Sequence, residues 1–328
     1  MQRSNFVRSL LALAAAAAVV PFTAHAQATK LTLGHGAAPG NPRHEAAVLF
    51  AERVKAKTAG RIEIQVAHSA QLGDDAAMIT ALRSGTLDLS ANSQGAMANV
   101  VPEYAALGLP FLFADAGKAW QTLDGPLGQE LAKRTAAKGM VVLGYWDNGI
   151  RHVTNAKRPV KAPADLKGLK IRTPPDTMTV DIMQMLGADT QQIKFAELYV
   201  ALQQGVVDGQ ENPLTNIASA KLYEVQKYLT LTGHKYEATP FVIGKRAWDK
   251  LSPADQKVFT EAAAEATQMQ RKLAKEADEK LVAELKAKGV QIETVDRKAF
   301  VEATKPVYAK WQSGPVGDFV KQVMQQAQ

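Results

Sequence analysis

Apolar and polar residues follow two periods along the chain, which predicts short strands alternating with amphipathic helices. Residues 62–66 alternate apolar and polar side chains, as a half-buried strand does. Asn41 and Pro42 mark the start of a helix, and Gly85 marks the end of another, because glycine adopts the left-handed conformation at low cost. We predict strands at 31–33, 62–66 and 87–89 and helices at 42–57 and 74–83. This order is typical of an α/β fold with a mainly parallel sheet covered by helices.

The pattern Ala-Leu-x-x-Gly-x-x-Asp-x-x-x-Asn occurs twice, at residues 81–92 and 201–212. In both copies a helix ends at a glycine, and a short strand then leads to Asn92 or Asn212. Ligands bind beyond the carboxyl ends of strands in open parallel sheets. We therefore predict two similar lobes with Asn92 and Asn212 on facing walls. Chance similarity between two short segments is the alternative.

A long helical pattern begins at Ser252, where a capping box with Pro253 at the first helical position starts a helix. The pattern reaches Lys288, just before Gly289. A helix of about 35 residues is about 50 Å long, which exceeds the length of one lobe. We expect this helix to span or brace both lobes. A further amphipathic helix is predicted at residues 316–324.

The N-terminal residues have the organisation of a secretory signal peptide. Arg3 and Arg8 precede a short apolar segment, Pro21 follows it, and Ala24-His25-Ala26 has the small residues that signal peptidase recognises. The apolar segment is shorter than the roughly 20 residues that a membrane span needs. We expect residues 1–26 to be removed after Ala26 and the protein to act in the periplasm; a buried N-terminal helix or a retained anchor is the alternative.

The composition excludes several classes of protein. The chain of 328 residues contains no cysteine, so a disulfide framework, a thiolate metal site and a cysteine nucleophile are ruled out. The formal charge is +7, but basic residues are interspersed with acidic ones, as in residues 272–288, which is typical of a solvated surface and not of a nucleic-acid interface. The histidines lack close metal-ligand spacing. We therefore expect no metal, no cofactor, no nucleic acid and no membrane-embedded segment after residue 26.

Two arginines stand where strands are predicted to end. Arg172 closes the apolar segment 169–172, and Arg151 follows a strand at 141–145 and a turn containing Gly149. A planar guanidinium presents parallel N–H groups that match a carboxylate in a bidentate pair. By residue type alone, the favoured interpretation of Arg172 is a surface arginine and that of Trp146 is a core aromatic. Asp74 and Asp75 stand at a helix start, where capping accounts for them.

Several longer segments together resemble the DctP-like substrate-binding proteins of tripartite ATP-independent periplasmic (TRAP) transporters. These segments are residues 71–73 (QLG), 110–113 (PFLF), 149–155 (GIRHVTN), 168–173 (GLKIRT) and 201–213 (ALQQGVVDGQENP). The resemblance covers essentially the whole chain after residue 26. It implies a type II periplasmic binding protein fold, with two lobes, a hinge and a long helix spanning both. We expect lobe I at 27–148, with about 236–275 returning to it, and lobe II at 149–235, with about 276–328 returning to it.

The resemblance also implies roles for individual residues. Arg172 looks like the residue that grips a ligand carboxylate, with Arg151 and Asn212 as partners on the same group. Phe195 and Trp146 resemble the aromatic walls of the pocket, and His234 resembles a polar pocket residue. The implied partner is a membrane permease driven by an ion gradient, and we expect the binding protein to be a monomer.

The identity of the ligand depends on residues of the first lobe. Its candidate residues are Arg43, His44, Gln71, Asn92, Ser93 and Gln94. Arg43 could pair with the second carboxylate of a C4-dicarboxylate, but we expect it to face solvent, as most helix arginines do. The neutral groups suit hydroxyls, so we favour a hydroxylated monocarboxylate or sugar acid. A protein that signals to a sensor kinase and a periplasmic enzyme on the same fold are the alternatives.

Overall fold

The structure is a computed structural model that describes residues 28–327. The predicted signal peptide and the cleavage after Ala26 lie outside the described residues. Among residues 28–327, no helix is long and apolar enough to cross a membrane.

Within residues 28–327, nine strands form one sheet in the order β2-β1-β3-β8-β4-β7-β5-β6, with β9 paired to β8. The outer pairs β1–β2, β1–β3, β5–β6 and β5–β7 are parallel, and the central pairs β3–β8, β8–β4 and β4–β7 are antiparallel. The prediction of a mainly parallel sheet therefore holds for each outer part and is wrong for the centre. The strands are β1 (Thr29–His35), β2 (Ile62–Ala67), β3 (Leu89–Ala91), β4 (Met140–Asn155), β5 (Lys170–Thr173), β6 (Asp189–Gln192), β7 (Gly209–Pro213), β8 (Tyr228–Gly244) and β9 (Gln291–Glu293).

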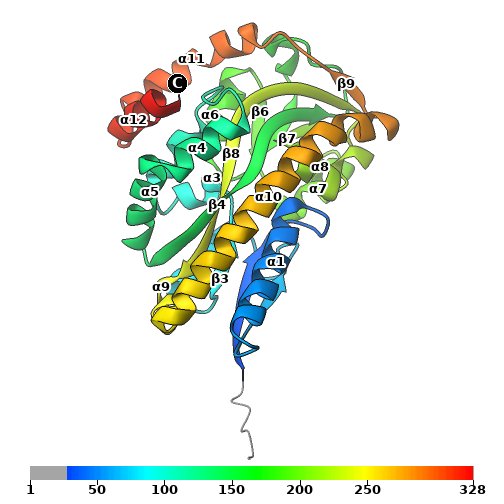
Figure 1. Ribbon diagram of the computed structural model, residues 1–328. Helices are drawn as coiled ribbons and strands as arrows, with labels where there is room; N and C mark the ends of the chain where they lie inside the picture. The colour runs from blue at the N-terminus through cyan, green and yellow to red at the C-terminus, as the bar shows by residue number, and fades with distance from the viewer. Residues whose placement is uncertain (1–27, 328) are drawn as a thin grey trace, which may run out of the picture.

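Helices cover the sheet and connect its strands (Figure 1). The α-helices are α1 (Pro42–Lys57), α2 (Asp75–Ser84), α3 (Gln94–Ala98), α4 (Ala116–Asp124), α5 (Pro126–Ala136), α6 (Thr177–Met185), α7 (Phe195–Gln203), α8 (Leu214–Ser219), α9 (Lys245–Trp248), α10 (Pro253–Ala287), α11 (Lys298–Gln312) and α12 (Gly317–Ala327). The 3-10 helices are η1 (Pro102–Gly108), η2 (Pro163–Leu166) and η3 (Leu222–Glu224). The side chain of Asn41 caps α1, as predicted, and Gly85 ends α2 in the left-handed conformation.

The two long central strands, β4 and β8, are shared by both ends of the sheet. The predicted turn after residue 145 is wrong, because β4 continues without interruption to Asn155. The strand accommodates Gly149 through a register shift against β8 between Asp147 and Gly149, where Gly149 has a φ of +119°. A bulge of this kind bends a strand without ending it. The pairing of β4 with β8 thus joins the β1–β3 side to the β5–β7 side.

The repeated sequence pattern folds the same way in both copies. Gly85 and Gly205 follow α2 and α7 with φ values of +83° and +69°. The carboxylates of Asp88 and Asp208 then accept the backbone N–H groups of Thr32 and Lys170, at 2.8 and 2.9 Å. Each aspartate therefore ties the strand that follows it to the neighbouring parallel strand.

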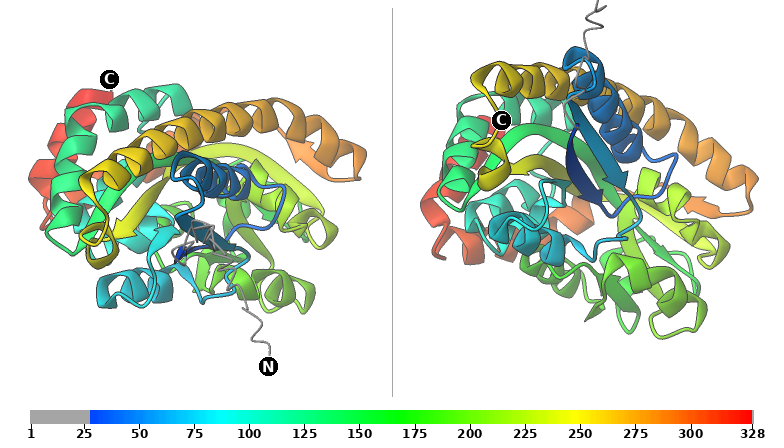
Figure 2. Two further views of the ribbon diagram at one scale, coloured as in Figure 1. Left: turned by 60° about the horizontal axis from the view of Figure 1, so that its bottom comes forward. Right: turned by 90° about the horizontal axis from the view of Figure 1, so that it is seen from below.

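Helix α10 has 35 residues and runs diagonally past both ends of the sheet, as predicted from its length (Figures 1 and 2). It contacts α1 and β4, and it also contacts α8 and β9. At Gly144 of β4 an added Cβ would come within 2.6 Å of the Thr267 hydroxyl, so the absence of a side chain allows the helix to lie close to the strand. This helix therefore braces both lobes.

Two of the hydrophobic clusters lie at opposite ends of β8 and α10. One contains Phe50 and Phe241, and the other contains Leu198 and Leu229, while α10 contributes Phe259 to the first and Leu285 to the second. The last helix, α12, contacts η1 and α4, which lie in the range predicted for lobe I. The lobe boundaries themselves stay a prediction.

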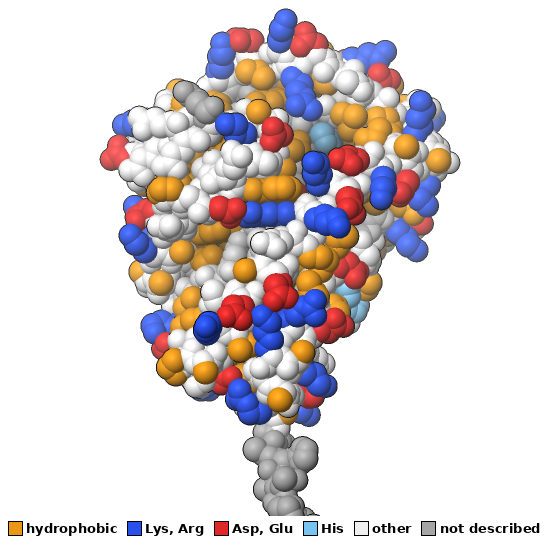
Figure 3. All heavy atoms as spheres, in the orientation of Figure 1, with side chains coloured by type: hydrophobic (Ala, Val, Ile, Leu, Met, Phe, Trp, Pro, Cys, Tyr) orange, Lys and Arg blue, Asp and Glu red, His pale blue; other side chains and the backbone are white. Residues whose placement is uncertain are grey.

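Basic and acidic side chains are interspersed over the face seen in Figure 3, and neither sign gathers into a large area there.

Candidate functional site

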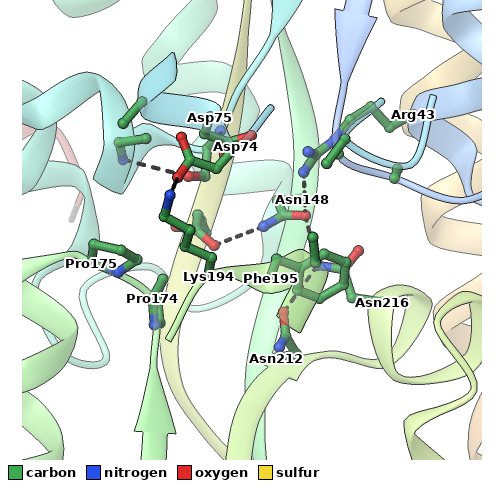
Figure 4. Close-up of a pocket in the computed structure, with 18 of the residues that line it drawn as sticks. Arg43, Asp74, Asp75, Asn148, Pro174, Pro175, Lys194, Phe195, Asn212 and Asn216 are labelled. Atoms are coloured by element: carbon green, nitrogen blue, oxygen red, sulfur yellow. Dashed lines mark hydrogen bonds and ion pairs between the residues drawn. The ribbon is translucent and has the colours of Figure 1, made fainter. Parts of the chain in front are cut away.

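A cleft of about 820 Å³, part of it open to solvent, lies between the two ends of the sheet. One wall comes from α1, α2 and α3, and the other comes from β5, β7 and the start of α7. Asp74 and Asp75 lie on the first wall, and Pro174, Phe195 and Asn212 lie on the second (Figure 4). The segments that form the cleft are far apart in sequence.

Arg172 lines the cleft from β5 and is 2% exposed. Its Nε donates to the Ile193 carbonyl at 2.7 Å, and its guanidinium carbon lies 6.0 Å from the centre of the Phe195 ring. Among residues 28–327, neither terminal nitrogen of Arg172 has a hydrogen-bond partner. Burial lowers the pKa of Arg172 to about 10, and the neighbouring charge of Arg151 acts in the same direction. A bound anion would relieve this cost.

Arg151 also lines the cleft, but most of its N–H groups are already bonded. Glu211 accepts from Nε at 2.5 Å and from Nη2 at 2.7 Å, and Glu237 accepts from Nη1. The backbone carbonyl of Glu211 takes a further bond from Nη2. Burial alone would lower the pKa of Arg151, but the two carboxylates outweigh it and raise the pKa. These bonds hold Arg151 in one position in the lining of the cleft. One N–H of its Nη1 has no partner among the described residues.

Asparagine side chains link the two walls beside these arginines. Asn148 accepts from Arg43 Nη2 at 2.7 Å and from Asn216 Nδ2 at 3.2 Å, and it donates to Glu237 at 2.7 Å. Asn216 also donates to the side-chain oxygen Oδ1 of Asn212 at 3.1 Å. Asn212 thus lies in the cleft, as predicted, within a chain of hydrogen bonds that reaches α1 (Figure 4).

Arg43 lines the cleft, so the expectation that it faces solvent is wrong. It is 6% exposed, and its Nη2 also donates to Thr239 at 3.0 Å. Burial lowers its pKa, which the nearby charges of Asp75 and Glu237 partly offset. The Arg43 side chain can be buried because the Asn148 amide and the Thr239 hydroxyl accept hydrogen bonds from one end of its guanidinium.

Acidic groups lie at the start of α2, on the wall opposite Arg172. Asp75 accepts the Ser93 backbone N–H on Oδ2 at 2.9 Å, and within residues 28–327 its Oδ1 has no hydrogen-bond partner. Asp74 accepts the Ala77 N–H on Oδ1 at 2.8 Å and pairs through Oδ2 with Lys194, also at 2.8 Å. This wall therefore offers hydrogen-bond acceptors to a ligand.

Three predicted site residues are buried outside the lining of the cleft. Trp146 is fully buried and stacks on Phe241 with ring centres 4.4 Å apart, so it packs in the core. Asn92 donates to Ser90 at 2.6 Å and does not line the cleft, so the expectation that Asn92 and Asn212 lie on facing walls is wrong for Asn92. Gln94 accepts the Ala238 N–H at 2.8 Å and holds α3 against β8.

His234, His44 and Gln71 also lie outside the cleft lining. His234 is fully buried and contacts Glu211 Oε2 through Nε2 at 3.1 Å, so it supports the carboxylate that holds Arg151. His44 is half-buried and lies 5.4 Å from the His35 ring. Gln71 is exposed.

The polar cleft residues that the sequence reasoning missed include Asp75, Asn148, Lys194, Asn216 and Glu237. Asn216 lies in the first turn of α8, which begins directly after β7, and a polar residue just beyond the carboxyl end of a strand was a usable signal. Asp75 was interpreted as a capping residue, whereas Asp74 is the cap of α2. Among residues 28–327, no group of three or more His, Cys, Asp or Glu side chains is placed to hold a metal ion.

Comparisons with known proteins place this architecture in one family. Protein y4mM of Sinorhizobium fredii is 57% identical over 93% of this chain, and the chain spans 57% of that relative's length. The 2,3-diketo-L-gulonate-binding periplasmic protein YiaO of Escherichia coli is 39% identical over 86% of each chain. The crystal structure of a TRAP periplasmic solute binding protein from Polaromonas, bound to D-erythronate, is 38% identical and has a TM-score of 0.87, covering 90% of this chain and 98% of that one.

The two-lobe periplasmic binding fold, predicted from the sequence, is thus confirmed. Residues 33–314 match the DctP family, bacterial extracellular solute-binding protein family 7. This is a family of solute-binding proteins and not of enzymes. The chain belongs to the DctP family of TRAP solute-binding proteins.

Proposed function

We propose that the protein captures a small organic acid for a TRAP transporter and that Arg172 holds the ligand carboxylate in a bidentate pair. The single observation that carries this proposal is a buried guanidinium that faces the cleft and whose two terminal nitrogens have no hydrogen-bond partner in the described part of the chain. Arg151 would add its remaining N–H, and Asn212 would complete the polar surround. The ring of Phe195 beside Arg172 would exclude water and so strengthen the ion pair.

We further propose a hydroxylated monocarboxylate or sugar acid as the ligand. Asp75 lies on the wall opposite Arg172 and has a carboxylate oxygen without a partner among the described residues. A hydroxyl can donate to that oxygen, whereas a second carboxylate facing Asp75 would be repelled. YiaO is named for binding 2,3-diketo-L-gulonate, and the Polaromonas protein is bound to D-erythronate. Both compounds are hydroxylated acids, which supports this choice.

A C4-dicarboxylate is the second candidate, because Arg43 lies in the same cleft. Its Nε and Nη1 have no hydrogen-bond partner among residues 28–327. A ligand long enough to span from Arg172 to Arg43 could pair a carboxylate with each. The proximity of Asp75 to Arg43 offsets part of that positive charge and weighs against this alternative.

The setting of this function is also proposed. We infer that residues 1–26 are a signal peptide cut after Ala26 and that the protein delivers its ligand to a membrane permease. YiaO and the Polaromonas protein are periplasmic by name, which supports export. Because the chain matches a solute-binding family, we propose binding without catalysis and favour delivery to a permease over signalling to a sensor kinase.

A thermal-shift screen followed by calorimetry tests the function. The acids are D-erythronate, 2,3-diketo-L-gulonate, succinate and malate, and a neutral sugar is the control. An acid at 1,000 times its dissociation constant should stabilise the protein by about 4 kcal/mol. Stabilisation by none of a broad set of organic acids would contradict the proposal, and tighter binding of succinate or malate would favour the dicarboxylate alternative.

A further inference from the structure

Three consecutive residues before and at the start of α7 each make a contact that bears on the cleft. The carbonyl of Ile193 accepts Arg172 Nε at 2.7 Å. The ring of Phe195 lies 6.0 Å from the guanidinium carbon of Arg172. Between them, Lys194 extends across the cleft and pairs with Asp74 at 2.8 Å (Figure 4). The segment 193–195 therefore touches the proposed carboxylate-binding group and the opposite wall at once.

The Lys194–Asp74 ion pair joins the two lobes. Asp74 is fixed as the cap of α2, because its Oδ1 accepts the Ala77 N–H at 2.8 Å. Lys194 is the residue before α7, and its position depends on β5 through Ile193. Within residues 28–327 this is the one ion pair that connects a residue between 29 and 98 to a residue between 170 and 219.

We propose that Lys194 is a positioning residue that couples closure of the lobes to the orientation of Arg172, by latching the segment 193–195 to Asp74 across the mouth of the cleft. This inference rests on the proposed function for the identity of its ligand. When the latch forms, Ile193 and Phe195 are held against the guanidinium, and the path out of the cleft is crossed by the Lys194 side chain. When it opens, the ligand can leave and the segment is free to move.

The strength expected of the latch follows from its exposure. The side chains of Lys194 and Asp74 are 56% and 21% exposed, so water and salt screen their attraction. Ion pairs of this kind are weak, so we expect a change in the release rate of up to about fivefold. The latch should therefore tune the release rate of the ligand without determining whether it binds.

The first test measures ligand release by stopped-flow mixing, using the tightest acid found in the screen. Lys194→Met keeps the aliphatic stem and removes the charge, and Asp74→Asn keeps the capping oxygen. Each variant should release the ligand about two to five times faster at low salt, with an association rate within twofold of wild type. Lys194→Arg should restore slow release, and the double variant should be no faster than either single variant.

Lys157→Met is the matched control, because Lys157 has a 60% exposed side chain and pairs with Asp208, which lies on the same lobe. Its release rate should equal that of wild type. The difference between Lys194→Met and wild type should disappear in high salt. Equal release by wild type and Lys194→Met at low salt would overturn the proposal, and so would additive effects of the two single variants.

A second test needs no ligand. The chain has no cysteine, so Thr80→Cys on α2 and Gln203→Cys on α7 allow spin labels on two exposed positions that do not line the cleft. Lys194→Met should broaden the distance distribution between the labels toward longer values, and Lys157→Met should not. An unchanged distribution would refute the latch. If no acid binds the wild type, the proposed function fails, while this measurement still decides the latch.

Discussion

Arg43, Arg151 and Arg172 all line the cleft, but they differ in how many of their N–H groups are already bonded. Glu211 and Glu237 accept hydrogen bonds from most of the N–H groups of Arg151. Asn148 and Thr239 accept hydrogen bonds from one nitrogen of Arg43. Among residues 28–327, Arg172 is held only through Nε, and both of its terminal nitrogens are left for a ligand. At the scale of the residue, partners therefore decide which arginine can bind a carboxylate.

The variant Arg172→Lys should nearly abolish ligand binding while the fold is retained. Lysine keeps the charge but cannot offer the two parallel N–H groups of a bidentate pair. The loss should be roughly 2–5 kcal/mol, which is about 30-fold to several thousandfold in the dissociation constant. Calorimetry gives the affinity, and circular dichroism checks the fold. Arg83→Lys, at an exposed position on α2, is the control; near-normal affinity of Arg172→Lys would assign this arginine a structural role.

At the scale of the element, β1 and β4 each bury a histidine whose Nδ1 accepts a backbone N–H. His35 accepts from Ala37 at 3.2 Å, and His152 accepts from Gly233 at 3.1 Å. Burial lowers the pKa of each to about 3, and nearby positive charge acts in the same direction. Each histidine therefore stabilises the fold in its neutral form. This contribution is fully present above the unfolded pKa of about 6.5 and is lost as the pH falls toward 3.

Replacing His152 with glutamine should reduce the loss of stability on acidification by about 2 kcal/mol between pH 7 and pH 5. Glutamine can still accept the Gly233 N–H through its oxygen but does not titrate. Urea denaturation of both proteins at the two pH values measures the difference.

The comparison with wild type is necessary because Asp147 and Asp278 titrate in the opposite sense. Burial raises their pKa values to about 6 and about 7, so their protonation stabilises the fold as the pH falls. An identical pH dependence in wild type and His152→Gln would show that His152 does not contribute in this way.

At the scale of the whole molecule, the elements that cross between the lobes define how they can move. β4 and β8 pair along most of their length, with register shifts near Val142, Asp147 and Arg151. Bulged strands bend more readily than regular ones. Arg43, Asn148 and Asn216 add hydrogen bonds between the lobes that a hinge motion would rearrange.

Small-angle scattering should show a larger radius of gyration without ligand than with a saturating acid. A ligand that contacts Arg172 on one wall and Asp75 on the other has higher affinity for the closed arrangement, and this differential affinity shifts the population. A neutral sugar at the same concentration is the control. The same radius in both conditions at saturation would exclude hinge closure on binding.

Local sequence patterns predicted where several helices begin or end, because caps and stops act over a few residues. Asn41 begins α1, Gly85 ends α2, and Ser252 begins α10, each through contacts within one turn. β4 was predicted too short, because Gly149 has the appearance of a turn residue in the sequence. Its pairing with both β7 and β8 carries the strand through that position.

The sequence by itself determined the α/β organisation, the long bracing helix, the family and the placement of Arg172 and Asn212 at strand ends. Only the tertiary structure decided which neighbours face the cleft. Trp146 and Asn148 would share one face of a regular strand. The register shift between Asp147 and Gly149 interrupts that alternation, so Trp146 packs on Phe241 while Asn148 reaches the cleft. Long-range pairing sets such a shift, and no local pattern encodes it.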